Sequence, residues 1–136
     1  MNNKLQKVNK DFVKMVEELG QEKSFQLKGK LLHGALGVST EAGEVLDFVK
    51  KYMFYGREIN TSDLKAELGD LLFYVQMVIQ YMGSSMEEIL AINLAKLNTR
   101  YPNGYNHGDA KVRDKEAEKI AIKKVENKYG KRQRKS

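Results

Sequence analysis

Hydrophobic positions recur with helical spacing through most of this chain. From Leu5 to Leu97, apolar side chains return every three or four residues, and no stretch alternates convincingly with period two. This spacing is typical of amphipathic helices rather than strands. Interruptions at Gly20, Gly56 and Gly83 divide the pattern into four helical segments. We therefore predict an all-α fold, with four principal helices packed as a four-helix bundle.

Residues suited to capping predict where the third and fourth helices begin. The segment 60–62, Asn-Thr-Ser, holds good N-cap residues for the third helix. Ser85 with Glu88 has the spacing of a capping box for the fourth helix. Pro102 ends that helix soon after Arg100, because proline cannot continue a helical hydrogen-bond pattern.

The second and third segments are expected to form the centre of the bundle. The third is apolar nearly all round after Asp70, which is typical of a buried helix. The second carries the small residues Gly34, Gly37 and Gly43, which permit another helix to approach closely. We therefore expect these two helices to pack against each other.

The C-terminal end differs from the rest in charge. The chain has a net charge of +6, yet residues 111–136 alone hold eleven Lys and Arg against four Asp and Glu. That balance of +7 leaves residues 1–110 close to neutral, at −1. We predict one domain over residues 1–110 and a basic C-terminal helix or tail over 111–136. Within the latter, residues 114–129 are expected to be helical and residues 131–136 disordered.

Composition excludes several classes of function. The chain has no cysteine, so disulfides, thiolate metal sites and cysteine nucleophiles are absent. The N-terminus lacks the apolar core of a signal peptide, and no apolar run reaches the roughly 20 residues of a membrane span. We expect a cytoplasmic protein without a membrane partner.

Two pairs of acids are the main candidates for chemistry. Glu41 and Glu44 form one pair, and Glu67 and Asp70 form the other. Residues spaced i,i+3 share a helix face, with Cβ atoms roughly 5–6 Å apart. Such pairs are common on solvated faces, but these border apolar stripes, where a carboxylate needs a cationic partner. Four acids on neighbouring helices predict a site for a hard divalent cation, Mg²⁺, and a phosphorylated substrate.

Three further residues on these helices are candidates for substrate binding. His33 lies eleven residues before Glu44, roughly 16 Å along the helix, which is too far to share one metal ion. A lone histidine on a helix is usually structural, and contact with the substrate away from the metal is the alternative. Tyr74, one turn after Asp70, is placed to stack on a flat part of the substrate, although a core role is nearly as well supported. Lys51, almost two turns beyond Glu44, is placed to reach a phosphate.

Polar residues near the end of the fourth helix complete the candidates. Asn93, Lys96 and Arg100 follow helical spacing and face one direction. They form either an exposed polar face or a cationic wall that holds phosphate oxygens.

The sequence around these residues resembles the MazG-like nucleotide pyrophosphohydrolases, of the all-α nucleoside triphosphate pyrophosphatase superfamily. The family pattern is Glu-x-x-Glu, a spacer, then Glu-x-x-Asp, and here the spacer is 22 residues. The runs 33–45, 50–56 and 67–74 carry the resemblance, together with Asn-x-x-Lys-Leu-x-x-Arg-Tyr-Pro over residues 93–102.

The resemblance implies a reaction and an assembly. It implies hydrolysis of a nucleoside or deoxynucleoside triphosphate to the monophosphate and pyrophosphate, with Mg²⁺ as cofactor and Mn²⁺ as a substitute. The four acids would be the catalytic metal ligands, and Asn93 and Lys96 would contact the substrate. The nucleoside would then lie at the end of the site near His33 and Tyr74, where Tyr74 would stack on the base or bond to the sugar. It also implies a homodimer or homotetramer with active sites near subunit contacts.

Alternatives remain open from sequence. Within the superfamily they are a dUTPase-like enzyme and a phosphoribosyl-ATP pyrophosphatase. Outside it, the basic tail suggests a nucleic-acid-binding helical protein, through phosphate contacts without sequence preference. Tyr129 is the one aromatic residue among those basic residues, so a base-stacking platform is not predicted. A purely structural bundle stabilised by metal is the last alternative.

Overall fold

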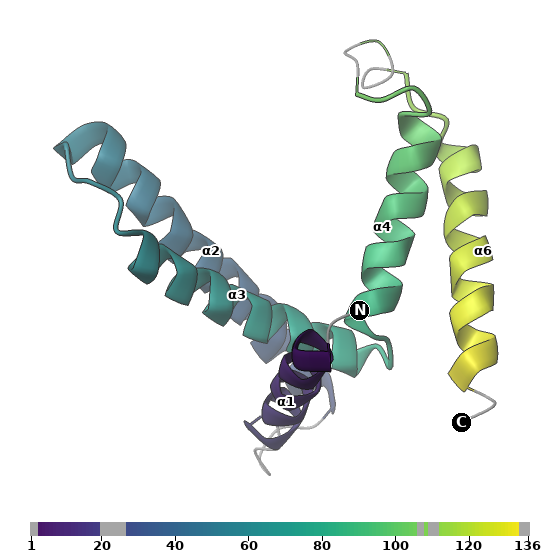
Figure 1. Cartoon of the computed structure of the whole chain (residues 1–136), viewed down its shortest axis with the longest axis horizontal. Coiled ribbons are helices and arrows are strands. Elements are labelled where there is room, and N and C mark those ends of the chain that lie inside the picture. The colour runs from purple at the N-terminus through teal and green to yellow at the C-terminus, as the bar shows by residue number, and fades with distance from the viewer. Residues whose placement is uncertain (1–2, 20–26, 106–107, 109–111, 134–136) are drawn as a thin grey trace. The chain divides into compact units, whose positions relative to one another are not determined.

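The computed structural model describes residues 3–19, 27–105, 108 and 112–133. The part of the chain described is helical, with turns between helices and no strand (Figure 1). The all-α fold class predicted from the sequence is confirmed. The helices are α1 (Asn3–Leu19), α2 (Leu27–Tyr55), α3 (Thr61–Tyr81), α4 (Met86–Arg100) and α6 (Lys115–Gln133).

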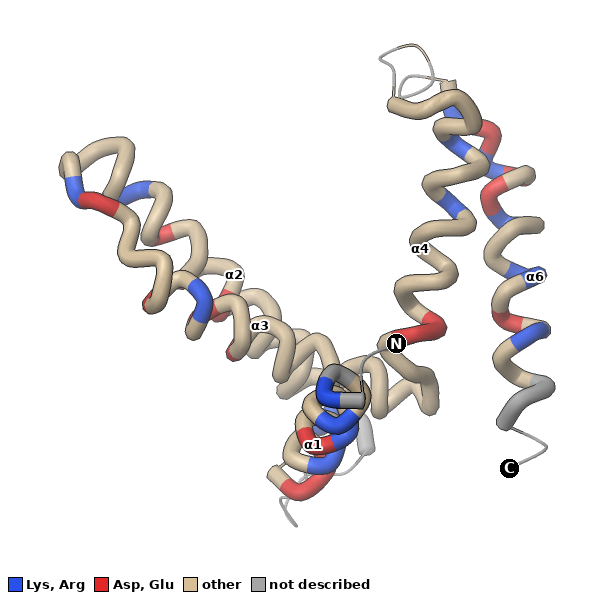
Figure 2. The backbone as a smooth tube through the Cα atoms, viewed as in Figure 1, with Lys and Arg blue, Asp and Glu red and all other residues tan. Residues whose placement is uncertain are grey.

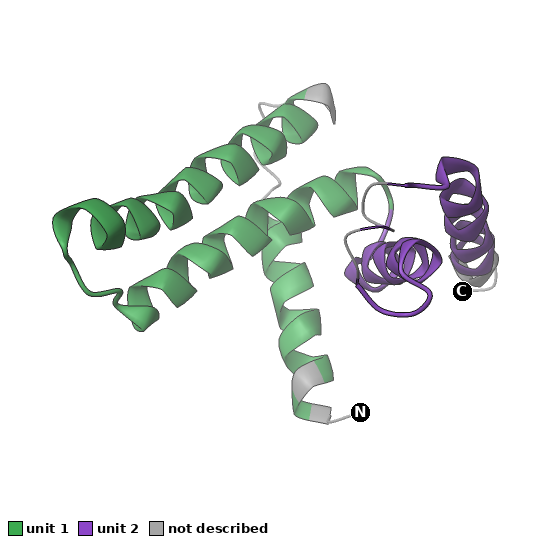
Figure 3. Cartoon of the chain, turned by 90° about the horizontal axis from the view of Figure 1, so that it is seen from above, with its two compact units in different colours: residues 1–83 green, residues 84–136 purple. Residues whose placement is uncertain are grey.

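The helices group into two compact units (Figure 3). Residues 1–83 contain α1, α2 and α3, and residues 84–136 contain α4 and α6. The predicted division into residues 1–110 and 111–136 stays a prediction, because these units group neighbouring helices by contact and do not test it.

In the first unit, α2 and α3 lie side by side, as expected for the centre of the fold (Figure 1). The close approach of the two helices requires glycine at two positions of α2. A Cβ atom added at Gly37 would lie 2.1 Å from the Tyr74 ring, and one at Gly34 would lie 2.8 Å from the Val78 side chain. At Gly43 such an atom would meet nothing within 4 Å, so the expectation of close packing there is wrong.

Helix α1 contacts α3 through both apolar and polar groups. Val16 of α1 is fully buried, and Met77 and Ile79 of α3 are buried with it in the core of the described residues. The Gln80 side-chain amide donates a hydrogen bond to the backbone oxygen of Val13 at 3.1 Å. This bond fixes the position of α1 along α3.

The ends of α2 and α3 follow the local signals in the sequence. Asn60 is the N-cap of α3, and its side-chain oxygen accepts a hydrogen bond from the Ser62 backbone N–H at 3.0 Å. Gly56 and Gly83, which follow α2 and α3, have φ angles of +62° and +64°. Glycine adopts this left-handed conformation without a Cβ penalty, which explains why both helices stop there.

The start of α4 matches half of the predicted capping box. The Ser85 hydroxyl accepts a hydrogen bond from the Glu88 backbone N–H at 3.2 Å. The Glu88 carboxylate accepts a hydrogen bond from the Ser84 hydroxyl at 2.7 Å, instead of from the Ser85 backbone N–H that a capping box would use.

In the second unit, α4 and α6 pair along their length (Figure 1). Tyr129 donates a hydrogen bond from its hydroxyl to the Glu87 carboxylate at 2.9 Å, near the start of α4. Lysines recur along α6, with acids between them (Figure 2). The helix extends to Gln133, so the predicted disorder is wrong for residues 131–133, and residues 134–136 lie outside the described part.

One face of α2 leaves large apolar side chains exposed. These side chains are each more than half exposed and share the face opposite Gly34 and Gly37: Leu32, Leu36, Leu46 and Met53. None of the helices described combines the length and apolarity needed to cross a membrane.

Candidate metal and nucleotide site

Three of the four predicted acids come together between α2 and α3. Glu41 of α2 and Glu67 and Asp70 of α3 each place a carboxylate oxygen within 4.8 Å of the other two. Glu41 and Glu67 are partly buried, whereas Asp70 is exposed. The cluster, named here the acidic triad, joins residues that are far apart in the sequence.

The helix contact explains why the acidic triad forms. Gly37 brings α2 against Tyr74 of α3, and Glu41 lies one turn further along the same face of α2. Glu67 and Asp70 are spaced i,i+3 and so share a face of α3. The close approach of the two backbones therefore places Glu41 opposite this pair.

The acidic triad is electrostatically unbalanced. The pKa of Glu67 is raised, first by partial removal from water and then by the charges of Asp70, Glu44 and Glu41. No member of the triad forms an ion pair with a Lys, Arg or His among the residues described. An external cation is therefore the natural partner for these charges.

The donor set fits a divalent cation. Carboxylate oxygens are the hard ligands that Mg²⁺ prefers, at about 2.0–2.1 Å in octahedral geometry, so oxygens on opposite sides of an ion lie about 4 Å apart. The triad oxygens already lie within 4.8 Å of one another. Small side-chain rotations would complete such a site, and Mn²⁺ takes similar ligands.

Glu44 lies outside the acidic triad. It was predicted to be the fourth ligand because it follows Glu41 by three residues. Its charge still contributes to the raised pKa of Glu67, so it belongs to the same electrostatic environment. Its role as a ligand stays a prediction.

The two residues predicted at the nucleoside end contact each other. The rings of His33 and Tyr74 meet edge to face, with centroids 5.7 Å apart. Tyr74 also packs against Gly37 and lies one turn beyond Asp70. The structure therefore places both residues on the same helix pair as the acidic triad, and their contact with substrate stays a prediction.

Lys51 is engaged with other residues of α2. Its ammonium group pairs with the Asp47 carboxylate at 2.5 Å and lies 5.9 Å from the centre of the Phe48 ring. Lys50 pairs with the same carboxylate, and these two lysines lower the pKa of Asp47. Contact of Lys51 with phosphate stays a prediction.

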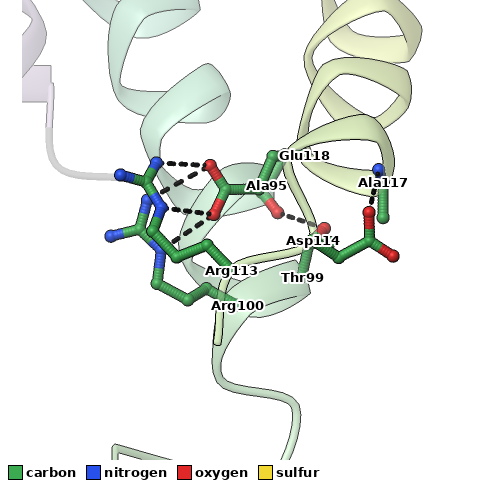
Figure 4. A network of polar contacts seen from close by, with 7 residues as sticks. All are labelled: Ala95, Thr99, Arg100, Arg113, Asp114, Ala117 and Glu118. Carbon is green, nitrogen blue, oxygen red and sulfur yellow. Dashed lines mark hydrogen bonds and ion pairs between the residues drawn. The ribbon is translucent and has the colours of Figure 1, made fainter. Parts of the chain in front are cut away.

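The remaining candidates belong to the second unit. Asn93 is exposed and Lys96 is partly buried, and neither forms an ion pair with another described residue. Arg100 instead binds Glu118 of α6 through two hydrogen bonds, from Nε at 2.8 Å and from Nη2 at 3.1 Å (Figure 4). The contacts of these three residues with substrate stay predictions.

Sequence reasoning missed the part played by Glu118 and Arg113. Arg113 also donates two hydrogen bonds to the Glu118 carboxylate, from Nη2 at 2.8 Å and from Nε at 3.3 Å. These arginines lower the pKa of Glu118 to about 2. A signal was present, since Glu118 shares the buried stripe of α6 with Ala121 and Val125.

Comparison with known proteins identifies the class to which this fold and site belong. The family model of the MazG nucleotide pyrophosphohydrolase domain matches residues 33–105, more than half of the chain. The matched segment contains all four predicted acids, Lys96 and Arg100. The chain belongs to the MazG nucleotide pyrophosphohydrolase family, which confirms the resemblance seen in the sequence.

A curated phage protein is also similar to this chain. The chain is 32% identical over 82 residues to the Gene 37 protein of Mycobacterium phage L5, across 57% of this chain and 72% of that protein. No solved structure gives a significant match to the chain.

Proposed function

We propose that this protein is a Mg²⁺-dependent nucleoside triphosphate pyrophosphohydrolase. It converts a nucleoside or deoxynucleoside triphosphate to the monophosphate and pyrophosphate, in control of the nucleotide pool. The observation that carries the proposal is the acidic triad, in which Glu41, Glu67 and Asp70 converge without a counter-ion from the residues that the structure describes. Membership of the MazG family gives the triad its chemical context.

The acids of the site have distinct parts in this proposal. A divalent cation, when bound, lowers the pKa of a water molecule and neutralises charge on phosphate oxygens. Glu41, Glu67 and Asp70 would hold this cation through their carboxylate oxygens. Glu44 lies outside the triad and is therefore available to accept a proton from the attacking water.

Other side chains bind the two ends of the nucleotide. The water attacks the α-phosphorus, and pyrophosphate leaves with Lys96 and Lys51 supporting its charge. His33 and Tyr74, whose rings contact each other on the same helix pair as the acidic triad, bind the nucleoside.

A pyrophosphate-release assay with a panel of canonical and modified nucleotides tests the function. We expect release that requires Mg²⁺ or Mn²⁺, stops with EDTA and returns when excess metal is added. Release of orthophosphate alone, or no release from any nucleotide, would contradict the proposal.

Hydrolysis in ¹⁸O-labelled water tests the point of attack separately. Attack at the α-phosphorus puts the label in the monophosphate. Label found solely in pyrophosphate would show that the water attacks elsewhere on the phosphate chain.

A further inference from the structure

Two arginines in the second unit share a single carboxylate. Arg100, only 16% exposed, binds both oxygens of Glu118 and is by itself sufficient to neutralise it. Arg113, 43% exposed, binds the same two oxygens. Arg100, Arg113 and Glu118 together therefore carry a net charge of +1.

The geometry leaves hydrogen-bond donors on both arginines. Each guanidinium uses Nε and Nη2 to bind Glu118, so Nη1 of each has no part in these bonds. The Tyr101 side chain is a second hydrogen-bond partner of Arg100 and, after Glu118, helps to raise its pKa. Figure 4 shows both guanidinium groups on the same side of the Glu118 carboxylate, each with a nitrogen atom directed away from it. Parallel guanidinium edges match the oxygens of a phosphate group.

Neighbouring contacts hold this arrangement in place. The Arg100 guanidinium carbon lies 5.8 Å from the centre of the Tyr101 ring. Glu118 lies in the first turns of α6, where its backbone N–H donates a hydrogen bond to the backbone oxygen of Asp114 at 3.1 Å. The pKa of Glu118 is about 2, so the carboxylate stays ionised at neutral pH and keeps both arginines bound. Donors fixed before binding lose less entropy when a ligand arrives.

We propose that Arg100 and Arg113 form a phosphate-binding pair, with Glu118 as the positioning residue that holds them side by side. The ligand is the phosphate chain of the nucleotide or the pyrophosphate product, so this inference rests on the proposed function. It adds two residues that lie beyond the matched segment 33–105, Arg113 and Glu118.

The first test is calorimetric binding of inorganic pyrophosphate, without metal, to the full chain. Arg113→Lys keeps the charge but removes the planar edge, and we expect affinity to fall about tenfold, the loss of one charge-assisted partner. Lys115→Ala, a nearby exposed charge, is the control and should have little effect. Equal affinity in Arg113→Lys and wild type, or no pyrophosphate binding by wild type, overturns the proposal.

The second test separates positioning from simple charge. Glu118→Gln makes the pair more positive, so a pure charge effect would tighten binding. If Glu118 positions the arginines, pyrophosphate binding instead weakens severalfold, and KM for the nucleotide rises more than kcat falls. Glu116→Gln, which removes an exposed α6 carboxylate paired with Lys119, is the matched control. Unchanged or tighter binding by folded Glu118→Gln overturns the positioning role, and if that variant does not fold, Arg113→Lys decides.

Failure of this inference and failure of the proposed function are distinguishable. Variants that weaken pyrophosphate binding, in a protein that releases none from nucleotides, would support the phosphate-binding pair and contradict the function. If the wild type releases pyrophosphate normally and the variants leave both pyrophosphate affinity and KM unchanged, the proposed function would be supported and the phosphate-binding pair contradicted. Variants that weaken binding of a single-stranded oligonucleotide but not of pyrophosphate would assign the pair to a polymer and overturn the inference.

Discussion

Asp70 is the exposed member of the acidic triad and the residue best suited to a conservative test. Asp70→Asn keeps the shape of the side chain and removes its charge, so the cation should bind more weakly and activate water less. We expect pyrophosphate release to fall by at least about 10²-fold, the lower end of an acid–base contribution. Steady-state assays over a range of Mg²⁺ concentrations measure both effects.

Asp63 supplies the control for that variant. It is exposed, lies in the first turn of α3 and is not part of the acidic triad. Asp63→Asn should therefore keep most of the activity. If Asp70→Asn stayed folded and retained near-normal activity, the metal site proposed here would be wrong.

The contact between His33 and Tyr74 predicts an effect on nucleotide preference. Tyr74→Phe keeps the ring that packs against Gly37 and removes only the hydroxyl, so the fold should survive. We expect the ranking of nucleotides by kcat/KM to change while the dependence on Mg²⁺ does not. His33→Gln should shift the same ranking. An unchanged ranking in both variants would remove these residues from the nucleoside site.

Glu118 predicts how stability depends on pH. Its pKa is about 2 in the folded protein and near 4.5 without its partners, so its stabilising effect is complete above pH 4.5 and disappears as pH falls towards 2. Glu118→Gln should unfold at lower urea concentration than wild type at pH 7. The difference should shrink between pH 4.5 and 2, where Glu118 becomes protonated. A difference that is constant with pH would contradict this account.

At the scale of helices, the contact of α2 with α3 predicts opposite effects at two glycines. Gly37→Ala would force a methyl group into the Tyr74 ring and should cost about 1–3 kcal/mol of unfolding free energy. Gly43→Ala meets no neighbour and should stabilise α2 by about 0.5–1 kcal/mol. Urea unfolding measures both. Equal effects of the two variants would show that α2 and α3 are not packed as described.

Helix ends were predictable because their signals are local. Asn60 and Ser85 act as caps, and Gly56 and Gly83 adopt left-handed φ angles, all within a few residues of the boundaries they set. The end of α6 was placed four residues early, at 129 rather than 133. There the sequence is rich in Lys and Arg, and charge was taken as a sign of disorder although these residues are good helix formers.

Contacts between helices were predictable only in part. Spacing along one helix correctly grouped Glu67 with Asp70, but which acid of α2 faces them depends on how two helices meet. The structure places Glu41 in the triad and Glu44 outside it. Arg100 was expected to face a substrate, and its contact with Glu118 was missed because the partner is 18 residues away across a loop.

For the whole molecule, the apolar face of α2 predicts self-association. Leu32, Leu36, Leu46 and Met53 leave a long apolar strip exposed, which is unusual for a monomer of this size. We propose that a second copy of the chain covers it, in a homodimer or homotetramer. Sedimentation at micromolar concentration should show an oligomer, and Leu36→Glu with Leu46→Glu should shift it towards monomer. A wild-type monomer would contradict the proposal.

The polar contacts at each end of the matched segment bear on how the protein can be divided. Gln80 donates to Val13 of α1, and Arg100 pairs with Glu118 of α6, yet both acceptors lie outside residues 33–105. An excised fragment limited to residues 33–105 would keep these two donor side chains, Gln80 and Arg100, and lose their acceptors. Recombinant fragments, grafts and chimeras of this protein should therefore be cut beyond α1 and α6, since the flanking helices complete the hydrogen bonding of the domain they border.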